Sequence, residues 1–512
     1  MSGRGPSHSL DRNLDALGYE AVSLALPYCY PPHLHCRFTS PSGVPLHALG
    51  AWSVWEVRLR PHRLFSPSLQ LLPGLCFPFI CSNRFLLSNS ALRTYGILFS
   101  LWLMVFTAAS QTIIITPILP IIGDELNVAE SLRGLLVTVY SFTLALAAVV
   151  MGPISDRIGR RRVLLLGSGS LAVMLLLHGL VGSFTELLVV RALAGAAGGM
   201  LSGAAVSYVG DYFPYARRGW ATGWVMSGVP FGLVLGIPLG RVLAASASFR
   251  VPFLVFSGLM AVSFLLIWRV VPQPDVELES ERVTVLGSLR RYRDLLKVSS
   301  VRVASLAYFL MYLSLGLLVV YLPQWLTANF PLDVSLFGQP LQFNGVRIDF
   351  IATLFLVGGT ASVVVGPAAG TLSDRIGRKP LILVSCFGLT VVTALVTYAV
   401  TERWVAYPIY VGIMALFSMR MSPLQALLTA LVPDRLRGTL LSLTIATGQV
   451  GTGLGASLAG VTYAGWGYRA TTWLSAVTIL LMALLVWGYL PEPGSPDAEE
   501  SKDEVAAQVA EV

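Results

Sequence analysis

The hexapeptide Ser155-Asp156-Arg157-Ile158-Gly159-Arg160 occurs a second time, unchanged, at residues 373–378. Each copy combines a carboxylate, two guanidinium groups and a glycine, which together can form a tight turn held by ion pairs. Such contacts contribute about 1–2 kcal/mol each when partly buried, enough to bias an equilibrium between two conformations. We therefore interpret the two loops as paired gates rather than as simple topology signals. The residues assigned to them are Gly152, Asp156, Arg157, Gly159, Arg160, Gly370, Asp374, Arg375, Gly377 and Arg378.

Two further guanidinium groups, those of Arg191 and Arg420, lie within long apolar runs. A charge at the centre of a membrane-spanning helix costs roughly 2.5–3.5 kcal/mol, so such a residue is a functional candidate by default. Arg420 has no counterpart in the other half of the chain, which favours a contact with a substrate or a counter-ion. The alternatives are that Arg191 extends to the membrane surface and that Arg420 pairs with an acid for structural reasons.

Polar and aromatic side chains also interrupt the apolar runs. They can line a ligand cavity, although each of them alone is more often a hydrogen-bonded contact between helices. The candidates are Gln111, Thr112, Tyr140, Tyr308, Tyr312, Gln425 and Gln449.

The composition indicates which elements position these residues. Of the 512 residues, 55% are hydrophobic and only 12% are charged, whereas soluble domains have about 25% charged residues. The apolar runs are about 20–25 residues long, which suffices to cross a hydrocarbon core as a helix, and they lack the alternation of barrel strands. The net charge is +8, but the basic residues crowd the short loops, which is typical of a membrane protein and not of a nucleic-acid-binding protein.

The runs predict twelve spanning helices in two sets of six. The first set covers residues 96–121, 132–152, 163–183, 186–209, 219–243 and 251–271, and the second covers 303–326, 350–371, 380–400, 404–430, 439–463 and 469–490. These sets define an N-terminal bundle over 96–271 and a C-terminal bundle over 303–490. A polar linker over 272–302 joins them and can include an amphipathic helix.

The two ends of the chain differ from the bundles. Residues 1–95 hold four of the five cysteines and show poor hydrophobic periodicity. We expect a poorly structured extension there, or a start codon assigned too early. Residues 491–512 form an acidic tail that we expect to be disordered.

Several markers indicate that the two sets of helices are copies. Asp156 and Asp374 are 218 positions apart, and Pro214 and Pro433 are 219 positions apart. Six helices per copy place both repeated loops on one face, so the two halves run parallel. The basic residues concentrate on that face, which predicts that the loops and both termini are cytoplasmic. The other face keeps only a few basic residues, such as Arg133, Arg250, Arg347, Arg403 and Arg469.

The loop from Gly152 to Arg162 resembles the signature loop of the major facilitator superfamily, which that family has between its second and third helices. Residues 370–379 are a second copy, between the eighth and ninth helices. The resemblance covers about residues 96–490. The runs Gln111–Pro120 and Gly232–Gly240 are most similar to the twelve-helix drug–proton antiporter branch of that family.

This resemblance implies an all-α membrane protein of twelve transmembrane helices in two pseudo-symmetric six-helix bundles. It also implies a secondary active transporter that works by alternating access and exports a small organic compound in exchange for protons. In similar proteins an arginine at the place of Arg191 is linked to proton coupling. We expect a monomeric, multi-pass protein of the cell inner membrane, whose partners are the substrate, protons and the lipid bilayer. We expect no enzymatic activity, cofactor or metal, and the sequence has no Gly-x-x-x-x-Gly-Lys-Ser/Thr loop for ATP.

The acidic residues leave the coupling mechanism open. No Asp or Glu lies deep in the first, fourth, seventh or tenth predicted helix, and Asp349 stands at the mouth of the eighth. Proton coupling needs a titratable group, usually a buried carboxylate. His178, the only histidine in a span, is expected to be a satisfied packing residue. Two alternatives to efflux therefore stay open: proton-coupled uptake of a small organic anion, and a non-transporting membrane receptor or assembly partner.

Overall fold

The computed structural model describes residues 89–274, 292–293, 295–336, 339–343, 346–430 and 437–490. Residues 1–88, most of the linker and the tail after residue 490 lie outside this part, so the expectations for them concern residues that are not described. The first described helix begins at Asn89, seven residues before the predicted start of the first bundle at residue 96.

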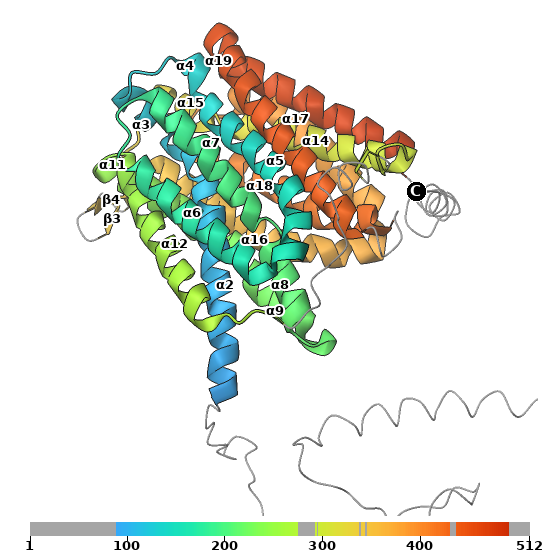
Figure 1. The fold of residues 1–512 in the computed structure, drawn as a ribbon. Coiled ribbons are helices and arrows are strands. Elements are labelled where there is room, and N and C mark those ends of the chain that lie inside the picture. The colour runs from blue at the N-terminus through green and yellow to red at the C-terminus, as the bar shows by residue number, and fades with distance from the viewer. Residues whose placement is uncertain are drawn as a thin grey trace, which may run out of the picture. The chain divides into compact units, whose positions relative to one another are not determined.

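The N-half, residues 89–274, is entirely helical between its loops (Figure 1). Its elements are α2 (Asn89–Ile113), α3 (Ile115–Glu125), α4 (Glu130–Arg133), α5 (Leu135–Ile158), α6 (Arg160–His178), α7 (Phe184–Leu201), α8 (Ala204–Tyr212), α9 (Tyr215–Met226), α10 (Gly228–Phe231), the π-helix η1 (Gly232–Gly236), α11 (Ile237–Ser246) and α12 (Arg250–Val270). Several spans are interrupted where the sequence disfavours a regular helix. Gly203, with φ of 77°, separates α7 from α8.

The C-half, residues 295–490, repeats this pattern. Its elements are α14 (Ser299–Val319), α15 (Leu322–Asn329), α16 (Phe350–Ile376), α17 (Arg378–Ala399), α18 (Arg403–Ala430) and α19 (Arg437–Tyr489). Two small antiparallel hairpins lie between α15 and α16, formed by β1 (Ser335–Leu336) with β2 (Gln339–Pro340) and by β3 (Gln342–Phe343) with β4 (Val346–Arg347). The sequence analysis did not predict these short strands, which lie outside the spans.

The described residues contain 11 helices that are long and apolar enough to cross a membrane. The last of them covers 50 residues, Leu440–Tyr489, whereas about 20 residues suffice for one crossing. Gly467 interrupts it with the non-helical angles φ 75° and ψ 178°. Divided at Gly467, it makes two spans, and the twelve predicted helices are confirmed.

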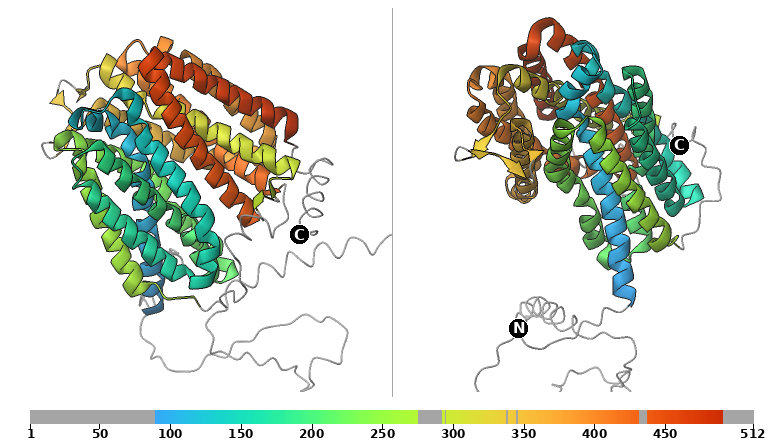
Figure 2. Two further views of the ribbon diagram at one scale, coloured as in Figure 1. Left: turned by 45° about the horizontal axis from the view of Figure 1, so that its top comes forward. Right: turned by 90° about the vertical axis from the view of Figure 1, so that its left-hand side faces the viewer.

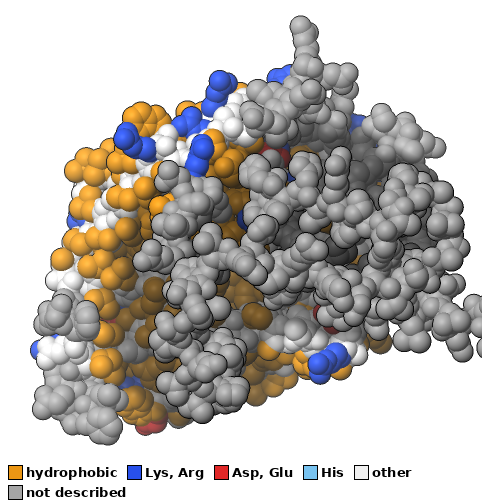
Figure 3. Space-filling view, turned by 90° about the horizontal axis from the view of Figure 1, so that it is seen from below, with side chains coloured by type: hydrophobic (Ala, Val, Ile, Leu, Met, Phe, Trp, Pro, Cys, Tyr) orange, Lys and Arg blue, Asp and Glu red, His pale blue; other side chains and the backbone are white. Residues whose placement is uncertain are grey.

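The surface of the bundle is apolar, as expected for contact with lipid. Leu146, Val364 and Trp487 expose 69%, 65% and 64% of their side chains. Patches of this extent are unusual on proteins that are surrounded by water. Figure 3 shows such apolar flanks, with several Lys and Arg side chains at the rim of the face in view.

The two halves lie side by side, with α5 and α19 at the seam between them (Figure 2). We call the end that holds the repeated loops, with Gly159 and Gly377, the loop end. The opposite end, with α4, α15 and Gly467, is the far end, and Figure 1 shows it opposite α8 and α9. Hydrogen bonds between described residues join the two halves toward the far end.

Equivalent glycines of the two halves have equivalent contacts. A Cβ atom at Gly236 in η1 would overlap Ser110 of α2, and a Cβ atom at Gly455 in α19 would overlap the Leu313 carbonyl of α14. These two glycines are 219 positions apart, so the offset that relates the sequences also relates the packing. Small residues let helices of each half approach closely in a membrane.

Candidate functional site

Arg191 is completely buried inside the N-half and does not reach the membrane surface. Its Nη1 atom donates to the Gln111 side chain at 3.3 Å, and its Nη2 atom donates to the Thr112 carbonyl at 3.3 Å. The guanidinium carbon lies 4.4 Å from the centroid of the Tyr140 ring. These contacts lie beside the interruption at Ile114, between α2 and α3.

Three of the predicted cavity residues form the surroundings of Arg191. The Gln111 amide donates to the Tyr140 hydroxyl at 2.7 Å, and the Thr112 hydroxyl lies 2.8 Å from the same oxygen. Gly195 and Gly198 of α7 allow this approach, because a Cβ atom at either position would crowd Tyr140. Gln111 and Tyr140 are buried, so these residues connect α2, α5 and α7 within one half in this conformation.

His178 also belongs to this region. Its Nδ1 atom lies 2.7 Å from the Met174 carbonyl, and its ring stacks on Phe253 with 4.5 Å between centroids. The guanidinium carbon of Arg191 lies 6.0 Å from the centroid of the same Phe253 ring. The Nε2 atom of His178 is buried without a hydrogen-bond partner among the described residues. The expectation of a fully satisfied packing residue was therefore wrong for one of its two ring nitrogens.

Arg420 is also completely buried, in α18 of the C-half, but its surroundings differ. Its Nη1 atom lies 3.8 Å from the Cys386 sulfur, and its guanidinium carbon lies 5.1 Å from the centroid of the Phe417 ring. Its Nε and Nη2 atoms have no hydrogen-bond partner among the described residues. The structural ion pair that was the alternative for Arg420 is not present in the described part of the chain.

The predicted cavity residues of the C-half lie on α14, α18 and α19, and Tyr312 lies within electrostatic reach of Arg420. Tyr308 and Tyr312 lie one turn apart on α14, with 6.0 Å between their ring centroids. Tyr308 is buried and Tyr312 is half-buried, whereas Gln425 is exposed and Gln449 is half-buried.

The two repeated loops have the same backbone turn. Gly159 has φ 91° and ψ 143°, and Gly377 has φ 95° and ψ 149°, a region that favours glycine. Arg160 donates to Asp211 of α8 at 2.9 Å and to Ser155 at 3.0 Å, and Arg378 donates to the Ala426 carbonyl at 3.0 Å. These contacts therefore connect each loop to its own half.

The other gate residues are placed as follows. Gly370 faces Ser422 of α18, whose hydroxyl oxygen would lie 3.3 Å from a Cβ atom. Arg157, Asp374 and Arg375 are exposed. Gly152 and Asp156 lie in α5, and the surroundings of both residues are outside the described part of the structure.

The first contact between the halves at the far end is ionic. Arg241 of α11 donates from Nε to Asp349 at 2.7 Å, and the two side chains are only 3% and 13% exposed. The Nη1 atom of Arg241 also donates to the Pro117 carbonyl in α3 at 2.8 Å. We call the contact of Arg241 with Asp349 the ionic seam.

Sequence reasoning named Asp349 only as a residue at a helix mouth, and it missed Arg241. The available signal was a guanidinium within the predicted span 219–243, directly after the glycine-rich run that ends at Gly240. A sequence does not reveal that these two residues, 108 positions apart, meet across the two halves.

A second contact between the halves is made by neutral groups, and we call it the neutral seam. Beside it, the Arg133 guanidinium donates across the halves to the Gln324 side-chain oxygen at 2.8 Å. The Thr138 hydroxyl donates to the Gly453 carbonyl at 2.7 Å and lies 2.7 Å from the Ser457 hydroxyl. Tyr321 accepts from the backbone N–H of Gly134 at 2.9 Å. A Cβ atom at Gly134 would overlap the Ala456 carbonyl, so the helices touch backbone to backbone.

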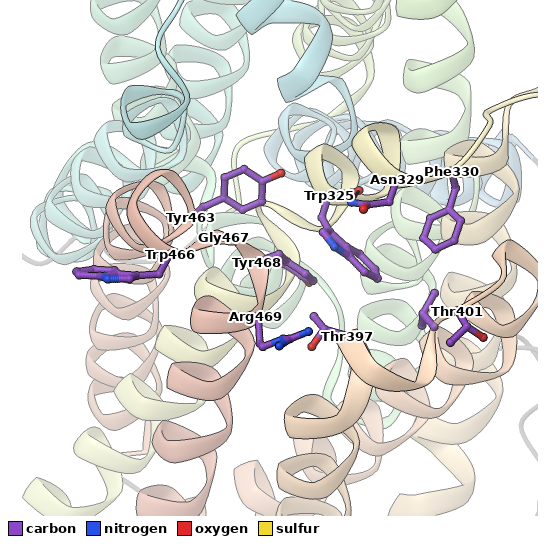
Figure 4. A pocket seen from close by; sticks show the side chains of 11 residues that line it. Trp325, Asn329, Phe330, Thr397, Thr401, Tyr463, Trp466, Gly467, Tyr468 and Arg469 are labelled. Carbon is purple, nitrogen blue, oxygen red and sulfur yellow. Dashed lines mark hydrogen bonds between the residues drawn. The ribbon is translucent and has the colours of Figure 1, made fainter.

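A separate cavity of about 580 Å³ lies at the far end of the C-half (Figure 4). Aromatic side chains dominate its walls, and Trp325 stacks on Tyr468 with 5.1 Å between centroids. Arg469 carries the charge among its described lining residues. The described lining includes none of the predicted cavity residues, so this cavity is distinct from the surroundings of Arg191 and Arg420.

Comparison with known proteins also identifies a duplicated membrane transporter fold. The family model of the Major Facilitator Superfamily matches residues 101–341 and 304–510. The chain is 26% identical over 393 residues to the uncharacterized MFS-type transporter YceJ of Bacillus subtilis (strain 168), with 75% of this chain and 95% of that protein covered. It is 25% identical over 395 residues to the multidrug resistance protein MdtG of Salmonella paratyphi C (strain RKS4594), with 76% and 94% covered.

Solved structures share the fold at low sequence identity. A D-xylose-proton symporter superimposes with a TM-score of 0.64 and 18% identity, covering 78% of this chain and 98% of that one. A bacterial homologue of the human lysosomal transporter Spinster, in an inward-facing and unoccupied conformation, superimposes with a TM-score of 0.60 and 17% identity, covering 81% and 98%. Since the family model matches most of the chain and the twelve helices form two repeated bundles, this protein belongs to the major facilitator superfamily.

Proposed function

We propose that this chain is a secondary active transporter that exports a small organic compound in exchange for protons. The observation that carries the proposal is the pattern of bonds between the halves. Among the described residues, these bonds lie toward the far end. Two bundles joined at one end can rock against each other, so that a path between them opens to one side at a time.

The proposed orientation places the loop end and both termini in the cytoplasm. The loop end carries basic residues such as Arg157, Arg160, Arg161 and Arg162 in one short segment, and several Lys and Arg side chains are visible at the rim in Figure 3. Short loops rich in Lys and Arg stay on the cytoplasmic side. In this orientation the described conformation is closed toward the outside of the cell inner membrane.

Within this proposal the two buried arginines have different tasks. Arg191 takes part in proton coupling, because its neutral partners Gln111 and Tyr140 can exchange hydrogen bonds when the half rearranges. Arg420, with two unpartnered nitrogens, contacts the substrate. The named activity of the relative MdtG supports a drug-like compound as the substrate.

Everted membrane vesicles test the proposal directly. With a proton gradient established, addition of a transported compound should release protons from the vesicle interior, and Arg191→Gln should abolish that release while leaving insertion intact. Asp156→Asn, in the proposed loop gate, should reduce transport severely. An unchanged gradient with every compound of a broad drug panel would contradict proton-coupled efflux.

One observation favours a second candidate, uptake of a small organic anion. A buried guanidinium without a counter-charge is costly, and Arg420 has no carboxylate partner among the described residues. The carboxylate of a transported anion would supply that partner. Uptake of labelled organic anions by intact cells, lost in Arg420→Gln and absent with organic cations, would support this candidate over efflux.

A further inference from the structure

The ionic seam contains an ion pair that crosses between the halves within the described part of the chain. Its acid, Asp349, comes from the C-half, and its base, Arg241, comes from the N-half. Because Arg241 also donates to Pro117, it connects α3 and α11 of one half to the start of α16 in the other. Breaking the pair removes the ionic contact that holds the halves together along this seam.

The two oxygens of Asp349 have separate tasks. Oδ1 accepts from the backbone N–H of Ala352 at 2.9 Å and caps α16, whereas Oδ2 accepts from Arg241. A protonated carboxyl group keeps one oxygen that can accept, but it has no charge and presents a hydroxyl donor on the other oxygen. Uptake of a proton is therefore compatible with the helix cap and incompatible with the ionic bond to Arg241.

The other charged and titratable groups near Asp349 are few. Tyr407 of α18 lies within electrostatic reach of Asp349 and of Arg403, and the Tyr407 hydroxyl is 2.5 Å from the hydroxyl of Thr353. On the loop before α16, Arg347 and Asp333 form an exposed pair at 3.9 Å. On the side of α3, the pair is contacted by the Pro117 backbone carbonyl, which accepts from Arg241. A guanidinium stays protonated at all relevant pH values, so only the carboxylate of the pair has an oxygen that can accept a proton.

We propose that Asp349 is the proton-responsive residue of the transport cycle at the far end. When it takes up a proton, Arg241 loses its counter-charge in a buried position, where an unpaired charge is unfavourable. Separation of the halves returns that charge to water, so proton uptake favours the conformation that is open at the far end. The inference rests on the proposed alternating access, and in the proposed orientation acid outside the cell would drive this opening.

Distance measurements across the far end test this inference without any transported compound. The native cysteines are replaced, and spin labels are attached to Ala245→Cys on α11 and Ala328→Cys on α15, both exposed positions. Distances are measured at about pH 7.5 and at about pH 3.5, which lies below the range in which an ordinary Asp carboxyl is ionised. We expect acid to shift the native protein from short to long distances. Asp349→Asn, whose amide oxygen can still cap α16, should show the long distances at both pH values, with an open population about a hundredfold above that of the native protein at the higher pH.

Two matched variants make the test specific. Asp349→Glu keeps a titratable carboxylate and should retain the response to acid. Glu125→Gln removes the carboxylate of the far-end pair with Arg250, which lies within the N-half, and it should also retain the response. A native protein whose distances do not change with pH, or an Asp349→Asn variant that responds like the native protein, overturns the inference.

The same labels separate this inference from the proposed function. If a transported compound changes the far-end distance but acid does not, alternating access stands and the role of Asp349 is refuted. If neither acid nor any transported compound changes it, the proposed function fails together with the inference.

Discussion

The ionic seam and the neutral seam occupy equivalent places in the two repeated halves. Arg241 and Gly460 are 219 positions apart, and so are Glu130 and Asp349. Both seams thus pair the fifth helix of one half with the second helix of the other. In the ionic seam the fifth helix of the N-half contributes the Arg241 guanidinium, which binds the Asp349 carboxylate. In the neutral seam the fifth helix of the C-half contributes Gly460, which packs against the Ser131 carbonyl.

This difference shows how a duplicated contact between the halves can be insensitive to protons in one copy and sensitive to them in the other. The neutral seam depends on close approach of backbones and on hydroxyl hydrogen bonds, which do not respond to pH in the physiological range. Its carboxylate, Glu130, is exposed and accepts from the neutral amide of Gln324 at 3.1 Å. The ionic seam depends on a charge that a proton can remove. We therefore expect the neutral seam to set how closely the halves fit and the ionic seam to set when they separate.

The largest effect is expected from filling the neutral seam. Gly134→Val places a branched side chain where even a Cβ atom overlaps the Ala456 carbonyl, and overpacking of this kind costs typically about 1–3 kcal/mol or more. The far end should remain open at every pH, and transport should be lost. Spin-label distances and vesicle transport measure the two outcomes, with Gly258→Val on α12 as a control, since a Cβ atom there has no neighbour within 4 Å. A Gly134→Val variant whose far end closes as in the native protein would contradict the close backbone contact at the neutral seam.

The next effect concerns the ionic seam. Arg241→Gln removes the charge that Asp349 binds, and we expect the closed far end to lose about 3 kcal/mol, because the remaining carboxylate is buried and unpaired. Arg241→Lys can keep the ion pair but not the second bond to Pro117, so its loss should be smaller and its response to acid should persist. The measurement is the far-end distance distribution at two pH values. The control is Arg250→Gln, which breaks the far-end pair within the N-half; an equal effect of the control would show that any far-end charge suffices.

The smallest effect is expected from Thr138→Val, which removes both hydroxyl contacts of the neutral seam. Hydrogen bonds between membrane helices contribute about 0.6 kcal/mol each on average, so the loss of two should raise the open population only by a factor of about eight. Its response to acid should be that of the native protein. Thr143→Val is the matched control, because the Thr143 hydroxyl bonds only to carbonyls of its own helix, those of Val139 and Tyr140. A loss of the acid response in Thr138→Val would contradict the division of tasks between the seams.

Much of the fold could be predicted from the sequence, and particular residues show why. The apolar runs placed the break between the last two helices at residues 464–468, and the helix is interrupted at Gly467. Length and hydrophobicity alone determine such a result, since a membrane requires about 20 apolar residues per crossing. The positive φ angles of Gly159 and Gly377 agree with the predicted tight turns, because few other residues adopt that conformation.

The site could be predicted only in part. Gln111, Tyr140 and Arg191 were each singled out, but a sequence does not show that they meet in one cluster. Arg420 was expected to contact a substrate or a counter-ion, but the sequence does not show that two of its nitrogens are buried without a partner among the described residues. Burial and pairing depend on how each helix is rotated about its axis, and in a uniformly apolar span the hydrophobic pattern does not specify that rotation.

The sequence by itself determined the class of the protein, its duplication, its twelve spans and the conformation of the repeated turns. These properties arise from short-range requirements, namely the length of a span, the charge of a loop and the backbone freedom of glycine. Only the tertiary structure decided that Arg241 meets Asp349 across the two halves while Gly460, at the equivalent position, packs on bare backbone. Such contacts join residues far apart in the chain, and their geometry is set by the packing of whole helices, which no local pattern records.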